Sequence, residues 1–187
     1  LLHGIRGGKE HFNSTSEYLN SNGYDTFAFD SRGHGESGGK YCTFGFKEKD
    51  DISAIVDYIV DNLHGSNISI WGQSLGGAIS IQALANDKRI NAGVVESTFS
   101  NFRTIVHDYA KDFVGIEIPV MTDYLIDRAG EIADFASDNI NPFRDCENIS
   151  QHMLIVHGNA DKKINISYGV RIFKNLKTEK NTYSVDL

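Results

Sequence analysis

The chain has 187 residues, of which 40% are hydrophobic and 23% charged, and it carries a formal net charge of −7. These values are ordinary for a soluble globular protein, and the length suits a single domain, residues 1–187, with one sizeable core. The negative charge argues against a nucleic-acid partner, and no apolar run reaches the ~20 residues of a membrane helix. We therefore expect a cytoplasmic protein without a transmembrane segment.

Strand and helix patterns alternate along the chain, which predicts an α/β fold with a mostly parallel sheet and helices on both faces. In chain order we expect a helix at 12–22, a strand at 24–29, a helix at 46–62, a strand at 68–71, a helix at 75–86 and a strand at 92–95. Residues 97–148 form a longer excursion, or cap. A strand at 153–156, a helix at 166–176 and a strand at 183–187 follow it.

The cap carries two amphipathic helical patterns. Their apolar residues are Phe99, Phe102, Ile105, Val106, Tyr109 and Phe113, and then Val120, Met121, Tyr124, Leu125 and Ile126. We expect most of them to bind the cap to the core and a minority to line an acyl pocket. The cap lacks a basic cluster, which favours a hydrophobic acyl group over a polyanion.

The most informative stretch is Gly72-Gln73-Ser74-Leu75-Gly76, between the expected strand at 68–71 and the expected helix at 75–86. Strand, G-x-S-x-G and helix together are the context of a nucleophile elbow. Glycine at both flanks removes side chains that would collide at so sharp a turn. The serine then stands at a helix N-terminus, where the dipole favours developing negative charge. A βα turn with a chance serine is the alternative interpretation.

Three further motifs accompany the elbow. The chain opens with Leu1-Leu2-His3-Gly4, residues 30–37 read D-x-R-G-H-G-x-S, and His157-Gly158-Asn159-Ala160-Asp161 follows a later strand. Together with the elbow, these motifs resemble the α/β-hydrolase superfamily, and above all its small bacterial esterase, lipase and aminopeptidase-like branch. The resemblance implies an α/β-hydrolase fold with a short helical cap, and a serine hydrolase that needs neither cofactor nor metal.

The resemblance also implies roles for individual residues. Ser74 would attack a carbonyl carbon and form an acyl-enzyme, and Asp161 would orient the histidine that takes the serine proton. The backbone N–H groups of Ile5 and Leu75 would form the oxyanion hole. Glu96, which ends the preceding strand, is a rival for the acid, and a plain turn residue is the alternative interpretation of Asp161.

The catalytic histidine of the family lies in a loop after the last strand, so we expect it beyond Leu187. None of the seven histidines in the chain is a convincing base. We expect His3 and His157 to hydrogen-bond nearby backbone and His34 to be structural. Because the family's first two strands precede the strand that ends at His3, we infer that the chain is an internal piece of a longer hydrolase.

Other interpretations stay open at this point. Residues 33–38 spell the dinucleotide signature G-x-G-x-x-G, although no helical pattern follows directly. Arg32 could hold a substrate carboxylate, but a structural salt bridge is the favoured interpretation.

For the function, we expect cleavage of small to medium acyl esters, with a small-molecule ester as the partner. The alternatives are an aminopeptidase, thioesterase or lipase on the same fold, or a non-catalytic binding protein. The sequence leaves the oligomeric state open.

Overall fold

A computed structural model describes residues 1–177 and 180–185 of the chain. Its centre is a four-stranded parallel sheet in the order β1-β2-β3-β4. The strands are β1 (Ile68–Gln73), β2 (Ile90–Glu96), β3 (His152–Gly158) and β4 (Lys180–Val185). Leu2 forms a parallel bridge with Gly72 on the free side of β1. Since all strands run in one direction, their carboxyl ends meet at one edge of the sheet.

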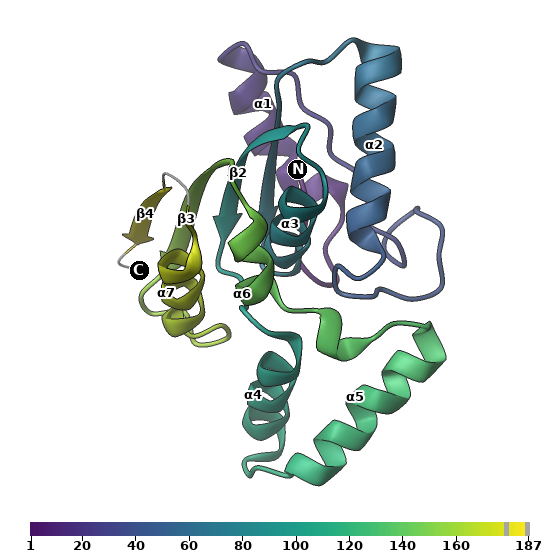
Figure 1. Ribbon diagram of the computed structural model, residues 1–187, viewed down its shortest axis with the longest axis vertical. Coiled ribbons are helices and arrows are strands. Elements are labelled where there is room, and N and C mark those ends of the chain that lie inside the picture. The colour runs from purple at the N-terminus through teal and green to yellow at the C-terminus, as the bar shows by residue number, and fades with distance from the viewer. Residues whose placement is uncertain (178–179, 186–187) are drawn as a thin grey trace.

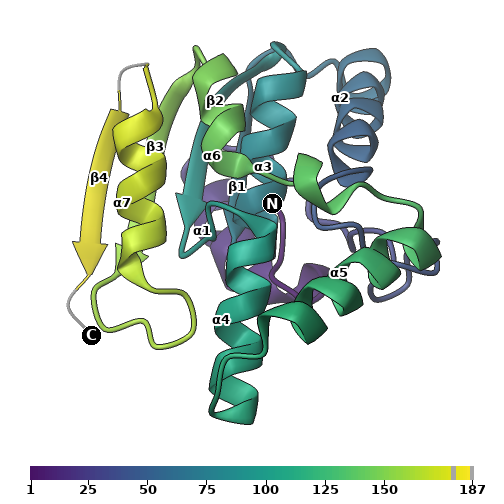
Figure 2. The same ribbon diagram turned by 60° about the horizontal axis from the view of Figure 1, so that its bottom comes forward.

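Helices cover both faces of this sheet (Figure 2). The α-helices are α1 (Asn13–Ser21), α2 (Glu48–Leu63), α3 (Leu75–Asn86), α4 (Phe102–Val114), α5 (Pro119–Ala133), α6 (Pro142–Asp145) and α7 (Ile166–Asn175). Short 3₁₀ turns are η1 (Lys9–Phe12), η2 (Ser137–Asn139) and η3 (Cys146–Asn148). Helices α3, α6 and α7 lie in front of the sheet and α1 lies behind it, while α4 and α5 project from the body as a cap (Figures 1 and 2).

The core is built around α3. This helix is buried from Leu75 to Leu84 and packs closely on the sheet because the strands beneath it carry glycines. At Gly93, for example, a Cβ atom would lie 2.5 Å from Leu84 Cδ1. On the opposite face, the Trp71 ring of β1 meets the ring of Phe12, with centroids 6.4 Å apart. Burial of these apolar side chains on both faces is the main stabilising contribution in such a layered fold.

Most of the expected elements are confirmed, and α3 has the predicted bounds. The expected strand at 24–29 is wrong, because the structure assigns no strand there. The segment accepts a hydrogen bond from Leu1 N to Phe27 O at 2.9 Å. Aromatic content alone does not make a strand, because strand formation depends on pairing and packing with neighbouring segments. Residues 186–187 of the last expected strand lie outside the described residues.

The two cap helices have clear start and stop signals. The Asn101 side chain accepts a hydrogen bond from Thr104 N at 3.0 Å and caps α4, which ends at Gly115 with φ 82°. Helix α5 begins with Pro119, a residue suited to the first turn because its missing N–H would lack a partner there anyway. These signals make α4 and α5 a helical hairpin.

The expectation that the cap's apolar residues mostly bind it to the core holds for some of them. Phe102 is buried, and its ring packs on Phe44 at 4.4 Å and on Phe135 at 5.9 Å between centroids. The buried members are Phe99, Phe102, Ile105 and Ile126, with Val106 partly buried. The expectation is wrong for Tyr109, Phe113, Val120, Met121, Tyr124 and Leu125, which are exposed.

Candidate active site

Ser74 occupies the sharp turn between β1 and α3, with φ 55° and ψ −116°. Positive φ is uncommon for a residue other than glycine and marks a strained position. The flanking glycines make the turn possible. A Cβ at Gly72 would lie 2.1 Å from Gly76 O, and a Cβ at Gly76 would lie 2.2 Å from Leu2 O. The chain therefore has the geometry of a nucleophile elbow at Ser74.

The backbone of Ser74 is fixed by the neighbouring strand. Its N–H donates to Glu96 O at 2.8 Å, and its carbonyl oxygen accepts from Thr98 Oγ1 at 2.7 Å. One step further along the sheet, Ser97 N donates to Val156 O at 2.9 Å. These bonds tie the carboxyl ends of β1, β2 and β3 together. In open parallel sheets, ligands bind at this edge.

The loop after residues 1–3 passes directly beside Ser74. A Cβ at Gly4 would lie 3.3 Å from Ser74 Cβ and 3.8 Å from its Oγ. His3 holds the loop: its Nε2 accepts from Ser31 N at 3.0 Å, so the proton lies on Nδ1, which donates to Gly4 O at 2.8 Å. Burial lowers the pKa of His3, which favours this neutral form. Both ring nitrogens bind backbone, as expected from the sequence.

The two expected oxyanion donors, Ile5 and Leu75, belong to the two segments next to Ser74, the loop after residues 1–3 and the start of α3. Leu75 is buried at the first position of α3, directly after Ser74. Ile5 is half-exposed and lies in the loop that Gly7 N closes by donating to Gly4 O at 3.0 Å. Its side chain is exposed and is not part of the core.

Asp30 holds the far end of the same loop. Its carboxylate accepts from Lys9 N at 2.7 Å and from Glu36 N at 3.0 Å. These backbone bonds, the one from Glu36 first, lower the pKa of Asp30 to about 2. A Cβ at Gly35 would lie 2.3 Å from Asp30 Cγ, so the D-x-R-G-H-G turn folds tightly around the carboxylate. The motif is therefore a structural support for the loop beside Ser74.

Neither alternative interpretation of this turn fits the structure. Gly33 N donates to Gly38 O at 3.1 Å, so residues 33–38 turn back on themselves, and the next helix starts only at Glu48. A dinucleotide loop would lead straight into a helix. Arg32 binds the carboxylate of Asp51 through both Nε, at 2.5 Å, and Nη2. The favoured salt-bridge interpretation of Arg32 agrees with this contact.

Asp161 lies three residues past the end of β3, at the same edge of the sheet. Its Oδ1 accepts from Lys163 N at 2.8 Å and from Ile164 N at 3.0 Å. The side chain is 21% exposed. Burial raises the pKa of Tyr109 on α4, and the Asp161 carboxylate adds to this rise. The carboxylate is both fixed by backbone and open to a further partner.

Glu96, the rival acid, is already engaged. It ends β2 opposite Gln73, and its Oε1 accepts from Gln73 Nε2 at 3.0 Å. The side chain is half-buried. This pairing matches the interpretation of Glu96 as a paired structural carboxylate.

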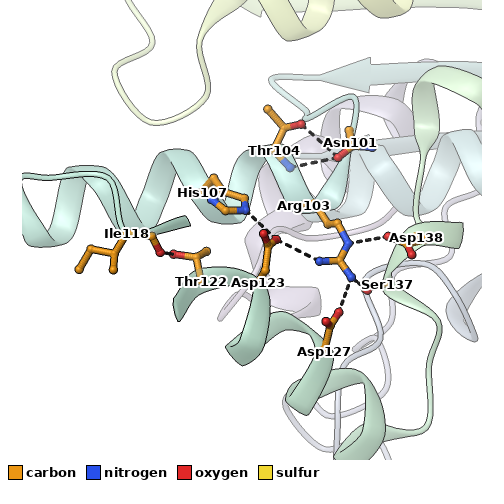
Figure 3. A network of polar contacts seen from close by, with 10 residues as sticks. All are labelled: Asn101, Arg103, Thr104, His107, Ile118, Thr122, Asp123, Asp127, Ser137 and Asp138. Carbon is orange, nitrogen blue, oxygen red and sulfur yellow. Dashed lines mark hydrogen bonds and ion pairs between the residues drawn. The ribbon is translucent and has the colours of Figure 1, made fainter. Parts of the chain in front are cut away.

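The cap is held together by Arg103, a residue that the sequence analysis did not single out (Figure 3). On α4, Arg103 donates to Asp123 at 3.1 Å and to Asp127 on α5, and to Asp138 at 2.5 Å. His107 Nε2 lies 3.0 Å from Asp123 Oδ1. The two aspartates are four residues apart and so share one face of α5, a spacing that could have suggested a basic partner.

A cavity of about 220 Å³ lies between the two cap helices, near this network. Its lining is both polar and apolar and includes His107, Asp108, Lys111 and Glu117 beside Ile118 and Pro119. Lys111 donates to Glu117 at 2.7 Å, so part of this charge is paired. The cavity offers polar contacts to a ligand but contains no serine or thiol nucleophile.

Neither a metal-binding cluster nor a membrane-spanning helix is present in the part of the chain that the structure describes. Among residues 1–177 and 180–185, no three histidine, cysteine, aspartate or glutamate side chains gather as a metal-binding set. No helix in the same residues is both long and apolar enough to cross a bilayer.

Comparisons with known proteins agree with the fold described above. A family model described as alpha/beta hydrolase fold matches residues 1–145. The structure of the esterase Pf2001 from Pyrococcus furiosus superposes with a TM-score of 0.80 at 26% identity, covering 100% of this chain and 71% of that one. The lysophosphatidylserine lipase ABHD12 of Danio rerio is 26% identical over 180 residues, which are 92% of this chain and 45% of the relative.

An inactive relative is similar as well. The inactive dipeptidyl peptidase 10 of Mus musculus is 23% identical over 176 residues, covering 90% of this chain and 21% of that protein. The chain thus spans less than half the length of these two curated relatives. Because the family model covers most of the chain, the chain belongs to the alpha/beta hydrolase family.

Proposed function

We propose that this chain is the catalytic part of a serine hydrolase that cleaves carboxylic esters of small to medium acyl groups through an acyl-enzyme. The observation that carries the proposal is the strained backbone of Ser74, held at φ 55° between Gly72 and Gly76. Strain of this kind costs of the order of 1–3 kcal/mol. Ser97 also has a positive φ, but Ser74 combines it with ψ −116°, with glycines at both flanks and with the start of α3.

In this proposal, Ser74 Oγ attacks the carbonyl carbon of the ester, and the carbonyl oxygen becomes an oxyanion. The N–H groups of Leu75 and Ile5 stabilise this charge, and the N-terminal dipole of α3 adds to the stabilisation. One such donor typically contributes about 3–4 kcal/mol in the transition state. The support for these roles is the position of Leu75 at the start of α3 and the close approach of Gly4 to Ser74.

A histidine takes the serine proton and then gives it to the leaving alcohol, whose bond to the acyl carbon breaks. Water then hydrolyses the acyl-enzyme with the same histidine as base. Asp161 orients this histidine through the carboxylate that Lys163 N and Ile164 N fix in place.

Esters are the favoured substrates because the superposed Pf2001 is an esterase. The apolar residues of the cap favour an uncharged acyl group. An aminopeptidase, a thioesterase or a lipase on the same fold is the runner-up, and the similarity to a lysophosphatidylserine lipase supports the last of these.

A second candidate function is a non-catalytic binding protein. The observation in its favour is the similarity to inactive dipeptidyl peptidase 10. The serine in the glycine-flanked turn at the start of α3 and the fixed Asp161 at the same sheet edge weigh against it, because a binding protein does not require this pair.

The test uses the protein encoded by the full open reading frame. We expect turnover of p-nitrophenyl acetate and butyrate, falling for long acyl chains, and much slower cleavage of aminoacyl p-nitroanilides. Faster cleavage of the anilides would favour the aminopeptidase, and a preference for long chains would favour the lipase. Binding of an ester without turnover at any chain length would favour the binding protein.

A further inference from the structure

We propose that His157 is a positioning residue for Asp161 and acts through the backbone of Ile164. The inference deepens the proposed function, since it rests on Asp161 being the catalytic acid. Its basis is a chain of two hydrogen bonds at the end of β3, one on each backbone group of a single buried residue.

The first bond joins His157 to Ile164. The distance from His157 Nε2 to Ile164 O is 2.7 Å, and since a carbonyl oxygen only accepts, Nε2 carries the proton. The second bond joins Ile164 to the acid: Ile164 N donates to Asp161 Oδ1 at 3.0 Å. Ile164 is itself 3% exposed, so it is fixed by packing as well as by these bonds. A shift of the His157 ring would therefore move the donor that orients the carboxylate.

His157 does not act on Asp161 directly. Its Nε2 lies 3.9 Å from Asp161 Oδ2, which is too long for a hydrogen bond. The ring is 4% exposed, and its Nδ1 has no hydrogen-bond partner among the residues that the structure describes. An apolar side chain would fill this buried space without an unsatisfied nitrogen. What histidine adds here is the bond to Ile164 O.

Helix α7 is shaped to fit this ring. A Cβ at Gly169 would lie 2.7 Å from His157 Nδ1 and 3.2 Å from its Cγ. Glycine is unfavourable inside a helix relative to alanine, so its presence within α7 has a local reason in the ring. The pair supplies an independent way to disturb the ring: Gly169→Ala adds one methyl group against it.

The experiment compares His157→Phe, which fills the space without a donor, with His157→Gln, whose amide can donate to Ile164 O. We expect kcat per active site, counted with a fluorophosphonate, to fall about 10²-fold in His157→Phe with little change in KM, because small displacements of catalytic groups cost this much. His157→Gln should recover most of the loss. The kcat of Gly169→Ala should also fall. The kcat of Val170→Ala, a change on the exposed side of α7, should match that of wild type.

A double variant separates positioning from general damage. When Asp161→Asn is already present, adding His157→Phe should lower kcat per active site by less than about 2-fold. The effects of residues that act as one unit are not additive. The inference would be overturned if the losses of kcat in the two single variants were fully additive. It would also be overturned if His157→Phe kept its kcat per active site while Asp161→Asn was inactive. Activity that survives in Asp161→Asn would overturn it too. Activity that survives in Ser74→Ala would instead count against the proposed function.

A readout independent of turnover completes the test. Amide hydrogen exchange of residues 163 and 164 should be faster in His157→Phe than in wild type and should return toward wild type in His157→Gln. Equal protection in all three proteins would contradict the bond chain even if no substrate were found.

Discussion

The hydroxyl of Thr98 donates a 2.7 Å hydrogen bond to the carbonyl oxygen of Ser74 and so fastens the elbow to the end of β2. Thr98 is buried, and a Cβ at Gly77 would lie only 2.8 Å from its Cβ. The strained serine is thus fixed from the next strand as well as by its flanking glycines. Strain of this kind persists only where the surroundings over-determine the backbone.

Thr98→Val tests this contact, because it keeps the shape of the side chain and removes the donor. The carbonyl of Ser74 still accepts from Gly77 N and Ala78 N, so we expect the free energy of unfolding to fall by only about 1 kcal/mol. Urea denaturation measures the change. A stability equal to that of wild type would show that the hydroxyl does not hold the elbow.

Gly76→Ala should be severe, because its Cβ would lie 2.2 Å from Leu2 O, a backbone atom that has no room to move. We expect a loss of about 1–3 kcal/mol of stability together with loss of activity. Gly38→Ala is the matched control, since a Cβ there meets nothing within 4 Å. Thermal melts of both variants check the prediction, and equal effects at the two glycines would contradict it.

Asp30 should make stability depend on pH in the acid range. Its pKa of about 2 in the folded protein lies below the ordinary value of 3.8. The stabilisation is therefore fully present above about pH 4 and is lost as pH falls through about 2. Asp30→Asn should be less stable at neutral pH and show a shallower decline in Tm between pH 4 and 2. A decline as steep as that of wild type would mean that Asp30 does not titrate in this way.

Local signals in the sequence were enough to predict the turn at Ser74 and the helix that follows it. The glycines around Ser74, the apolar strand before it and the continuous apolar helix after it are all adjacent in the chain, and α3 has the predicted bounds. Asp161 likewise follows a recognisable strand end. The hydrogen bonds that fix it come from residues two and three positions away, so the turn chemistry was visible in the sequence.

Features that depend on distant partners were not predictable in the same way. The expected strand at 24–29 had the right composition, but a strand also depends on pairing with a neighbouring segment, which composition does not specify. Arg103 binds carboxylates that lie 20 to 35 residues further along the chain, and only the fold brings them together. The exposure of Phe113 and Val120 also follows from how the cap projects, since their apolar character alone predicts burial.

Asp161→Asn should preserve the fold and reduce kcat by about 10⁴-fold, as loss of the acid does in a well-characterised triad, because the amide favours the wrong histidine tautomer. Glu96→Gln is the matched control at the neighbouring strand end, and we expect it to stay within a few-fold of wild type. Steady-state kinetics on both variants decide between them. A nearly normal Asp161→Asn beside an inactive Glu96→Gln would assign the acid to Glu96.

The most direct test of the serine hydrolase is the site of covalent labelling in the full-length protein. A fluorophosphonate should form one adduct, which peptide mapping places on Ser74, and Ser74→Ala should lose both the adduct and the hydrolysis of p-nitrophenyl acetate. Ser97→Ala is the control, since Ser97 is another half-buried serine with positive φ at the same sheet edge, and it should keep both. Undiminished labelling and turnover in Ser74→Ala would contradict the assignment of Ser74 as the nucleophile.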